Sequence, residues 1–268
     1  MTSQGVDVLP ALPGAGKVSA WNRLKRRMRE DFPLSGHFIS ALEGVMEDVR
    51  RHGWRRSRKA IIEAWLRQPQ RNLVLGAGTA VLPGWLNADI NPRVGRGLIF
   101  LDATEPFPLP DGCADIVFTE HMIEHIDYAQ GARMLRECFR VLRPGGVLRV
   151  STPDLAILLA LYRPDRAPDQ EWFIRYVAEN MITDCPYIDP IFVINNEFRA
   201  YGHQFLYDEP ALTRALELAG FQDIVRYPMG ESPNPALAGL EARTKKKIAG
   251  RYEMRTFETL ALEARRAQ

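Results

Sequence analysis

The chain has 268 residues, of which 46% are apolar and 25% are charged, and its 35 Lys and Arg and 33 Asp and Glu give a net charge of +2. These values are typical of a globular protein with a substantial core, and they exclude a disordered or a fibrous chain. No apolar run reaches the roughly 18 residues that a membrane-spanning helix needs, and residues 1–20 lack the apolar stretch of a secretory signal.

The basic residues gather near the N-terminus. Between residues 17 and 71 there are 14 Lys and Arg against 6 Asp and Glu, whereas residues 72–268 are mildly acidic. Residues 1–16 are rich in Pro and Gly, and we expect a disordered leader there. We expect a basic helical extension over residues 17–70, ahead of the main domain at residues 71–268.

Apolar side chains at helical spacing predict three helices in the extension, with breaks at residues 33–36 and at Gly53. The basic residues that fall between the apolar positions are 25–27, Arg55, Arg56, Arg58 and Lys59. We interpret them as the solvated face of helices that pack beside the core domain. Contact with nucleic acid, with a charged substrate or with an anionic membrane surface remains as an alternative.

From residue 71 onward, short apolar strands alternate with helices. The expected strands are residues 73–75, 86–90, 97–101, 114–119, 147–151, 221–227 and 256–264. The expected helices are residues 128–142, ended by the Pro and Gly of residues 143–146, and residues 211–219, ended by Gly220. This alternation predicts an α/β fold with a parallel sheet covered by helices.

Two segments interrupt the alternation. Residues 162–204 are long and rich in Pro and aromatic residues, and we expect a lid-like insertion with small elements of its own. Residues 232–251 carry a further expected helix. The three cysteines, Cys113, Cys138 and Cys185, are widely spaced and show no metal-binding pattern. Free thiols in a reducing compartment are the simplest interpretation, so a cytoplasmic protein is expected.

A glycine turn follows the first strand, and a carboxylate ends the second. Gly76 and Gly78 let a ligand approach the backbone, and Asp89 can accept hydrogen bonds from the hydroxyls of a ribose. A dinucleotide is disfavoured, because Val81 occupies the position of a third glycine. Asp89 also follows Gly78 by 11 residues, whereas a dinucleotide site has its acidic residue about 20 residues further on.

Six motifs, in this order along the chain, resemble those of class I S-adenosylmethionine-dependent methyltransferases. They are residues 75–78 (Leu-Gly-Ala-Gly), 83–89 (Pro-Gly-Trp-Leu-Asn-Ala-Asp), 101–102, 108–112, 115–126 and 141–147. The chain is most similar to the subgroup with a shortened first helix and a GW-N-D second strand. The resemblance implies a Rossmann-like, doubly wound, mainly parallel sheet of seven strands, with the helical extension at its N-terminal side.

The resemblance also implies S-adenosylmethionine as the cofactor and assigns residues to its parts. The implied residues are Gly76, Ala77 and Gly78 beneath the methionine and ribose, Asp89 at the ribose hydroxyls, Ile90 against the adenine, Asp102 and Ala103 near the adenine amine, and Thr119, Glu120 and His121 at the methionine end. The chain departs from the family pattern at Val74, where relatives carry an acidic residue that contacts the methionine portion.

The candidate catalytic residues are His121, His203 and Glu120. A general base accelerates methyl transfer to a hydroxyl or to a protonated amine by about 10²–10⁴-fold. His121 and Glu120 follow the fourth strand on the side of the methionine end, and His203 closes the insertion that should cover the acceptor. A purely structural role is the alternative for His203.

Residues 121–125 also match the zinc-peptidase pattern H-x-x-E-H. That pattern requires a helix, whereas here it begins at the end of a predicted buried strand. We therefore predict no metal site from this motif, and we interpret Glu124 and His125 as residues that hold the loop after the fourth strand.

Relatives of this subgroup imply methyl transfer to a small-molecule or saccharide acceptor, with oxygen favoured over nitrogen as the methylated atom. Nucleic-acid methylation is the first alternative, because the extension is basic. The sequence disfavours it, since no basic groove interleaved with aromatic residues is evident. The second alternative is a protein that binds S-adenosylmethionine without catalysis and acts through the helical extension.

Overall fold

The computed structural model describes residues 36–92, 97–241 and 251–268. The chain divides into two compact units, Met1–Gly53 and Trp54–Gln268. The described part of the first unit is helical and belongs to α2 (Gly36–Leu66), whose last residues, 54–66, lie in the second unit. All further elements lie in the second unit, which carries the sheet.

The expected helix break at Gly53 is wrong, because α2 is continuous from Gly36 to Leu66. A glycine inside a helix costs only about 1 kcal/mol relative to alanine, so the surrounding helix formers continue through it. The first expected helix and the basic residues 25–27 lie outside the described residues. At the end of α2, Trp65 is buried, and its indole N–H donates to the carbonyl oxygen of Asn72 at 3.2 Å.

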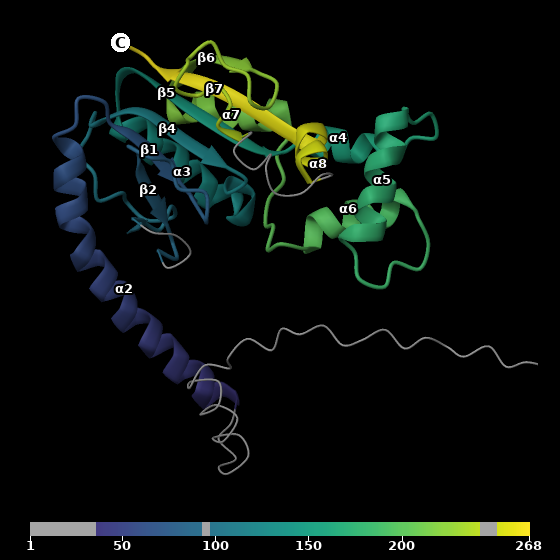
Figure 1. The fold of residues 1–268 in the computed structure, drawn as a ribbon, viewed down its shortest axis with the longest axis horizontal. Coiled ribbons are helices and arrows are strands. Elements are labelled where there is room, and N and C mark those ends of the chain that lie inside the picture. Colours follow the sequence, from purple (N-terminus) through teal and green to yellow (C-terminus); the bar gives the residue numbers. More distant parts are fainter. Residues whose placement is uncertain (1–35, 93–96, 242–250) are drawn as a thin grey trace, which may run out of the picture. The chain divides into compact units, whose positions relative to one another are not determined.

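The sheet has seven strands in the order β3-β2-β1-β4-β5-β7-β6 (Figure 1). The strands are β1 (Asn72–Leu75), β2 (Leu86–Asp89), β3 (Ile99–Phe100), β4 (Ala114–Glu120), β5 (Leu142–Pro153), β6 (Phe221–Arg226) and β7 (Thr259–Arg266). Strands β1 to β5 run parallel to their neighbours in that group, whereas β7 is antiparallel to both β5 and β6. The expected seven-strand, mainly parallel, Rossmann-like sheet is confirmed.

After β4, helices lie between successive strands, and four of them follow one another between β5 and β6. These helices are the 3-10 helix η1 (Ile123–His125) and the α-helices α3 (Tyr128–Val141), α4 (Leu155–Ala160), α5 (Pro168–Asn180), α6 (Pro190–Arg199), α7 (Glu209–Ala219) and α8 (Arg251–Glu258). Helix α3 begins with a capping box between Asp127 and Gln130, which satisfies two backbone N–H groups. Helix α7 ends at Gly220, whose φ of 104° requires a glycine.

Two expected boundaries are wrong. Residues 256–258 do not begin the last strand but complete α8, and β7 starts at Thr259. Helix α3 ends at Val141, because Leu142 is already extended, with φ −66° and ψ 137°. The Pro and Gly of residues 143–146 therefore belong to β5, where the pairing with β4 shifts register.

Both faces of the sheet are covered, which explains the near-continuous apolar runs in its strands. On one face, α3 and α7 contribute the buried residues Met134, Leu135, Cys138, Leu212 and Leu216 to the main core. On the other face, the loops around Trp85 and Leu240 pack against Val74 and Phe118. Among the described residues, no helix combines the length and the apolar character needed to cross a membrane.

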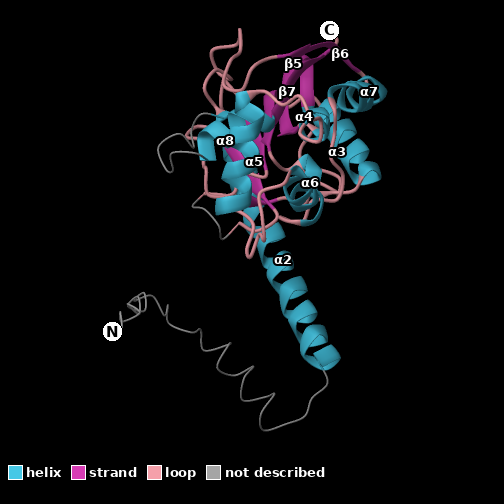
Figure 2. Ribbon diagram, turned by 90° about the vertical axis from the view of Figure 1, so that its right-hand side faces the viewer, coloured by secondary structure: helices cyan, strands magenta, loops and turns pink. Residues whose placement is uncertain are grey.

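Part of the insertion folds around a small core of its own. Buried residues of α4, α5 and α6 form this cluster, and they include Leu158, Phe173, Val177 and Val193. Figure 2 shows α5, α6 and α8 together, and Phe173 of α5 stacks on Phe257 of α8 with ring centroids 4.7 Å apart. The insertion thus contains small helices of its own, α5 and α6, and it follows α4 in the chain.

Candidate active site

The carboxyl ends of β1, β2 and β4 and the loop after β3 surround a cavity of about 330 Å³, which we call the strand-end pocket. Its lining residues are Gly76, Asp89, Ile90, Leu101, Asp102, Ala103, Thr104, His121, Met122, His125 and Ile126. This is the edge at which parallel α/β sheets bind ligands. The structure therefore brings together six of the residues that the sequence analysis assigns to a nucleotide site: Gly76, Asp89, Ile90, Asp102, Ala103 and His121.

The glycine turn forms one wall of the strand-end pocket. Gly76 has a φ of 66°, and a Cβ added there would lie 2.6 Å from Cγ of Met122. Gly78 has a φ of 53°, and its N–H donates to Oδ2 of Asp89 at 2.9 Å. Ala77 is buried and does not line the pocket, but its N–H donates to the carbonyl oxygen of Ala88 at 3.0 Å. Ala77 and Gly78 thus shape the turn and hold the second strand.

Two carboxylates and one apolar side chain border the pocket. Asp89 accepts a second hydrogen bond at Oδ1 from the N–H of Asn91 at 2.8 Å. Asp102 accepts at Oδ1 from both the N–H and the hydroxyl of Thr104, at 2.9 and 2.7 Å. Ile90 is 50% exposed although it is a large apolar residue. Oriented carboxylates beside uncovered apolar surface fit a ligand with a sugar and a planar ring.

Thr119 and Glu120 lie away from the strand-end pocket. The Thr119 side chain is fully buried, and β1 and β5 flank it in the sheet. The carboxylate of Glu120 is also buried and lies 3.6 Å from the guanidinium of Arg255 on α8. Thr119 and Glu120 directly precede His121 in the chain, but they are not among the residues that line the strand-end pocket.

A second cavity, of about 340 Å³, lies under the insertion, and we call it the lid pocket. Its lining residues are His121, Glu124, His125, Pro153, Met181, Glu197, Tyr201, His203, Met254, Arg255 and Glu258. His121 and His125 line both pockets, so the two cavities adjoin at these side chains. These two side chains therefore form a wall common to both cavities.

His121 lies at the junction of the two pockets, next to the Glu124 carboxylate. Its φ of 47° turns the chain sharply after β4. Its Nδ1 lies 3.3 Å from Oε1 of Glu124, and its Nε2 lies 3.1 Å from the hydroxyl of Thr259. Burial opposes the charged imidazolium, but the Glu124 carboxylate outweighs it and raises the pKa of His121. The Glu124 carboxylate thus favours the protonated imidazole, and both ring nitrogens of His121 already have polar neighbours.

The pKa of His203 is shifted in the opposite direction. The Nδ1 atom of His203 lies 2.6 Å from the carbonyl oxygen of Glu197, and because a carbonyl only accepts, Nδ1 carries the hydrogen. Burial lowers the pKa of His203, so the ring is neutral and its Nε2 has a free lone pair. Of the two histidines that the sequence analysis proposes as a base, His203 has the protonation state that a base requires.

Two buried carboxylic acids face the same cavity. Burial raises the pKa of Glu197 to about 7 and that of Glu258 to about 8. Groups with pKa values near neutrality can both accept and donate protons. The sequence analysis missed Glu197, Glu258 and Arg255, because no short motif marks them. The signal that could have found Glu197 is its position in the insertion, six residues before His203.

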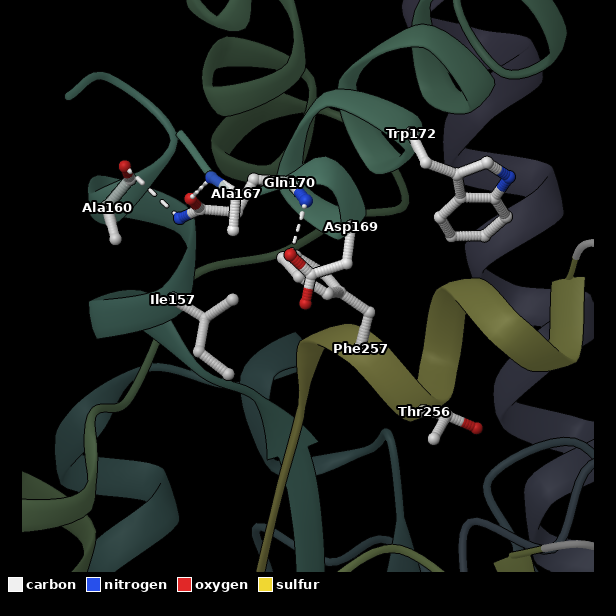
Figure 3. A pocket seen from close by; sticks show the side chains of 8 residues that line it. All are labelled: Ile157, Ala160, Ala167, Asp169, Gln170, Trp172, Thr256 and Phe257. Carbon is white, nitrogen blue, oxygen red and sulfur yellow. Dashed lines mark hydrogen bonds between the residues drawn. The ribbon is translucent and has the colours of Figure 1, made fainter. Parts of the chain in front are cut away.

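A third cavity, of about 870 Å³, lies between α4, α5 and α8 (Figure 3). Its lining residues are Ile157, Ala160, Ala167, Asp169, Gln170, Trp172, Thr256 and Phe257. The side chain of Gln170 bonds the backbone of Ala160 and Ala167, and Asp169 accepts from the Gln170 N–H at 2.9 Å. The wall of this third cavity is mainly apolar. The acid–base groups line the lid pocket instead.

Comparison with known proteins agrees with this arrangement. Residues 87–150 match the model of a methyltransferase domain family. A probable S-adenosylmethionine-dependent methyltransferase of Mycolicibacterium smegmatis is 56% identical over 48 residues, which are 18% of each chain. One of Mycobacterium tuberculosis is 51% identical over 67 residues, which are 25% of this chain and 24% of the relative. The matched segments thus span about a quarter or less of these relatives.

Solved structures of methyltransferases were also found. An S-adenosylmethionine-dependent methyltransferase from Mesorhizobium loti is 18% identical, with a TM-score of 0.45, over 78% of this chain and 97% of that one. The family match over residues 87–150 covers β2 to β5, the strands that carry most of the strand-end pocket. Residues 87–150 of this chain are therefore similar to a methyltransferase domain.

Proposed function

We propose that this protein transfers a methyl group from S-adenosylmethionine to a hydroxyl of a small molecule or a saccharide bound in the lid pocket. The observation that carries this proposal is the shared wall of the two pockets, formed by His121 and His125. It sets a cavity with acid–base groups directly beside the pocket at the strand ends. The free thiols of Cys113, Cys138 and Cys185 support a reducing, cytoplasmic compartment.

The strand-end pocket suits the cofactor. Asp89 is oriented toward a ribose by two backbone N–H groups, and Thr104 orients Asp102 through Oδ1, so that Oδ2 can face the adenine amine. The exposed Ile90 supplies an apolar surface for the adenine, and Gly76 supplies a backbone that a side chain would obstruct. When bound, the cofactor supplies an activated methyl group, so the protein mainly has to align the acceptor and exclude water.

The lid pocket suits a small polar acceptor. Its volume of about 340 Å³ lies at the lower end of the range for small-molecule sites, roughly 300–1,000 Å³. Oxygen is favoured over nitrogen, because a hydroxyl must lose its proton and the pocket holds proton acceptors. These are Nε2 of His203 and the carboxylates of Glu197 and Glu258. His121 has a polar neighbour at each ring nitrogen, Glu124 at Nδ1 and Thr259 at Nε2, so we assign it the role of orienting the junction.

Nucleic-acid methylation receives less support. Two basic residues of α2 are engaged within the domain itself: Arg55 pairs with Glu105 at 2.6 Å, and Arg58 donates to the carbonyl oxygen of Phe100 at 2.9 Å. These contacts support the interpretation that the end of α2 packs beside the core. Contact of the remaining basic residues with an anionic surface stays a proposal.

The test is a methyl-transfer assay with labelled cofactor and a panel of hydroxylated small molecules and monosaccharides, followed by assays in cell extract. We expect a small labelled product carrying an O-methyl group. We expect His203→Ala to lower the turnover rate by roughly 10²-fold or more, as for loss of a general base, and His52→Ala, at an exposed position of α2, to leave it unchanged. Cofactor binding without any labelled product would favour the non-catalytic alternative, and labelled RNA or DNA would favour the nucleic-acid alternative.

A further inference from the structure

Three potential metal ligands meet in the wall of the lid pocket. They are Glu124 and His125 of η1 and His203, which follows α6, and one ligand atom from each lies within 4.8 Å of the other two. We propose that these side chains bind a divalent transition-metal ion such as Zn²⁺. The motif at residues 121–125 alone does not form this site, since its third ligand comes from the far end of the insertion.

The orientation of His203 supports a metal ligand. The Glu197 carbonyl oxygen, 2.6 Å from Nδ1, fixes the tautomer and leaves the lone pair on Nε2. A second hydrogen bond of this kind, from the non-ligating nitrogen to a carbonyl or carboxylate, accompanies almost every histidine that binds a metal. His125 lies next to His203, with ring centroids 5.0 Å apart, so both imidazoles border the same space.

The Glu124 carboxylate provides a second, independent observation. Glu124 is fully buried, and its Oε2 accepts from the hydroxyl of Thr152 at 3.0 Å. Among the described residues, Oε1 has no hydrogen-bond partner, although it lies 3.3 Å from Nδ1 of His121. Buried carboxylate oxygens are rarely left without a donor. A cation bound at Oε1 would satisfy it, and the Thr152 hydroxyl would orient it.

Further ionisable groups border the proposed site. Besides Glu124, the carboxylic acids Glu197 and Glu258 line the lid pocket. The permanently charged cation on that wall is Arg255, which lies 3.6 Å from Glu120 and is partly exposed. The lining of this cavity thus combines three carboxylic acids with one arginine and three histidines.

The donor set indicates the class of metal. Two imidazoles and one carboxylate form the ligand set of several catalytic zinc sites, in which a fourth position stays open. Tetrahedral ligands at 2.0–2.2 Å from zinc lie roughly 3.4 Å from one another, so small side-chain rotations would close the observed cluster. The open position would face the lid pocket, where the ion could lower the pKa of an acceptor hydroxyl. With the ion bound, Nε2 of His203 is a ligand, and Glu197 and Glu258 remain as the proton acceptors.

Metal binding can be tested without the cofactor or an acceptor, so its outcome is independent of the proposed methyl transfer. Full-length, tag-free protein is stripped with a chelator and titrated with Zn²⁺ by calorimetry and with Co²⁺ by visible absorption. We expect one site per chain and tetrahedral Co²⁺ bands. His125→Ala, His203→Ala and Glu124→Gln should each weaken binding at least tenfold, whereas His52→Ala should match the wild type.

A variant that fails to fold does not leave the proposal untested, because the wild-type protein offers a second measurement. Diethyl pyrocarbonate modifies histidines with a free lone pair, and mass spectrometry locates the modified residue. We expect Zn²⁺ to slow the modification of His203 and not that of His52. The proposal is overturned by the absence of saturable Zn²⁺ binding in the wild type, by unchanged affinity in the folded variants, or by equal modification of His203 with and without Zn²⁺.

Discussion

The backbone N–H of Gly78 donates a hydrogen bond of 2.9 Å to Oδ2 of Asp89. This contact joins the glycine turn after β1 to the carboxylate at the end of β2, and it fixes the direction of that carboxylate. The two features that the sequence analysis singles out separately therefore act as one unit. The unit forms the wall of the strand-end pocket to which the cofactor is assigned.

Replacement of Asp89 tests this unit. We predict that Asp89→Ala weakens S-adenosylmethionine binding at least tenfold, because a hydrogen bond to a charged group contributes about 1.5–3 kcal/mol. Titration calorimetry measures the change. Asp165→Ala is the matched control, since Asp165 is 70% exposed and pairs only with the equally exposed Arg163 among the described residues. Affinity within twofold of the wild type in Asp89→Ala would remove Asp89 from the cofactor site.

Gly76→Ala tests the close packing of the turn. A side chain at φ 66° is strained by about 1–2 kcal/mol, and its Cβ would also meet Met122 at 2.6 Å. We predict a loss of stability in urea denaturation together with weaker cofactor binding. Gly239→Ala is the control for backbone strain alone, because its φ is 77° and no described atom lies within 4 Å of an added Cβ.

The contact with Met122 can be separated further. We predict that Met122→Ala restores part of the stability that Gly76→Ala loses, because it removes the obstructing Cγ. If Gly76→Ala and Gly239→Ala are equally destabilised, or if Met122→Ala gives no recovery, the clash with Met122 does not contribute.

Substitution of Arg149 tests the buried ion pairs that this residue of β5 forms with Glu241 and with Glu263 of β7. The Arg149 guanidinium is fully buried and bonds Glu241 at 2.5 Å and Glu263 at 2.9 Å. Removing one partner of a buried ion pair costs about 3–5 kcal/mol, because it leaves an uncompensated charge. We predict a loss of this size for Arg149→Met in urea denaturation. Arg163→Met, in an exposed ion pair, should stay within about 0.5 kcal/mol of the wild type.

The lowered pKa of Glu137 predicts that this carboxylate stabilises the fold in a pH-dependent way. Its hydrogen bond to Arg140 lowers the pKa of Glu137 below the ordinary value of 4.5, against a smaller opposing effect of burial. A carboxylate with a lowered pKa stabilises the fold above its unfolded pKa, and this contribution is lost as the pH falls through the folded pKa. We therefore predict that Glu137→Gln is less stable than the wild type at pH 7 and that the difference shrinks below pH 4.5.

Denaturation curves from pH 7 to pH 3 measure this effect. Glu179→Gln serves as the control, because Glu179 pairs loosely with Arg175 at 3.4 Å and is about half exposed. A stability difference between Glu137→Gln and the wild type that stays constant down to pH 3 would contradict the prediction.

The sequence predicts most of the sheet, because a strand buried on both faces needs a continuous apolar run and β4 shows one. It misplaces the start of β7, since residues 256–258 carry apolar and polar side chains that fit a strand or a helix equally well. It also breaks α2 at Gly53, because a local rule cannot weigh the helix formers on both sides. The error at β7 lies at an element boundary, where tertiary packing outweighs local preference, and the error at Gly53 lies inside a helix that tolerates one glycine.

By itself, the sequence determined the α/β alternation, the glycine turn and the positions of Asp89, Asp102 and His121 at strand ends. These follow from local rules, since parallel strands bring their carboxyl ends to one edge. Only the tertiary structure decided which residues face His121 across the lid pocket. Glu197 and His203 lie six residues apart in the insertion, whereas Glu258 ends α8, and their meeting depends on how the insertion and α8 pack. The same packing buries His203, which lowers its pKa, while the Glu197 carbonyl oxygen fixes its tautomer.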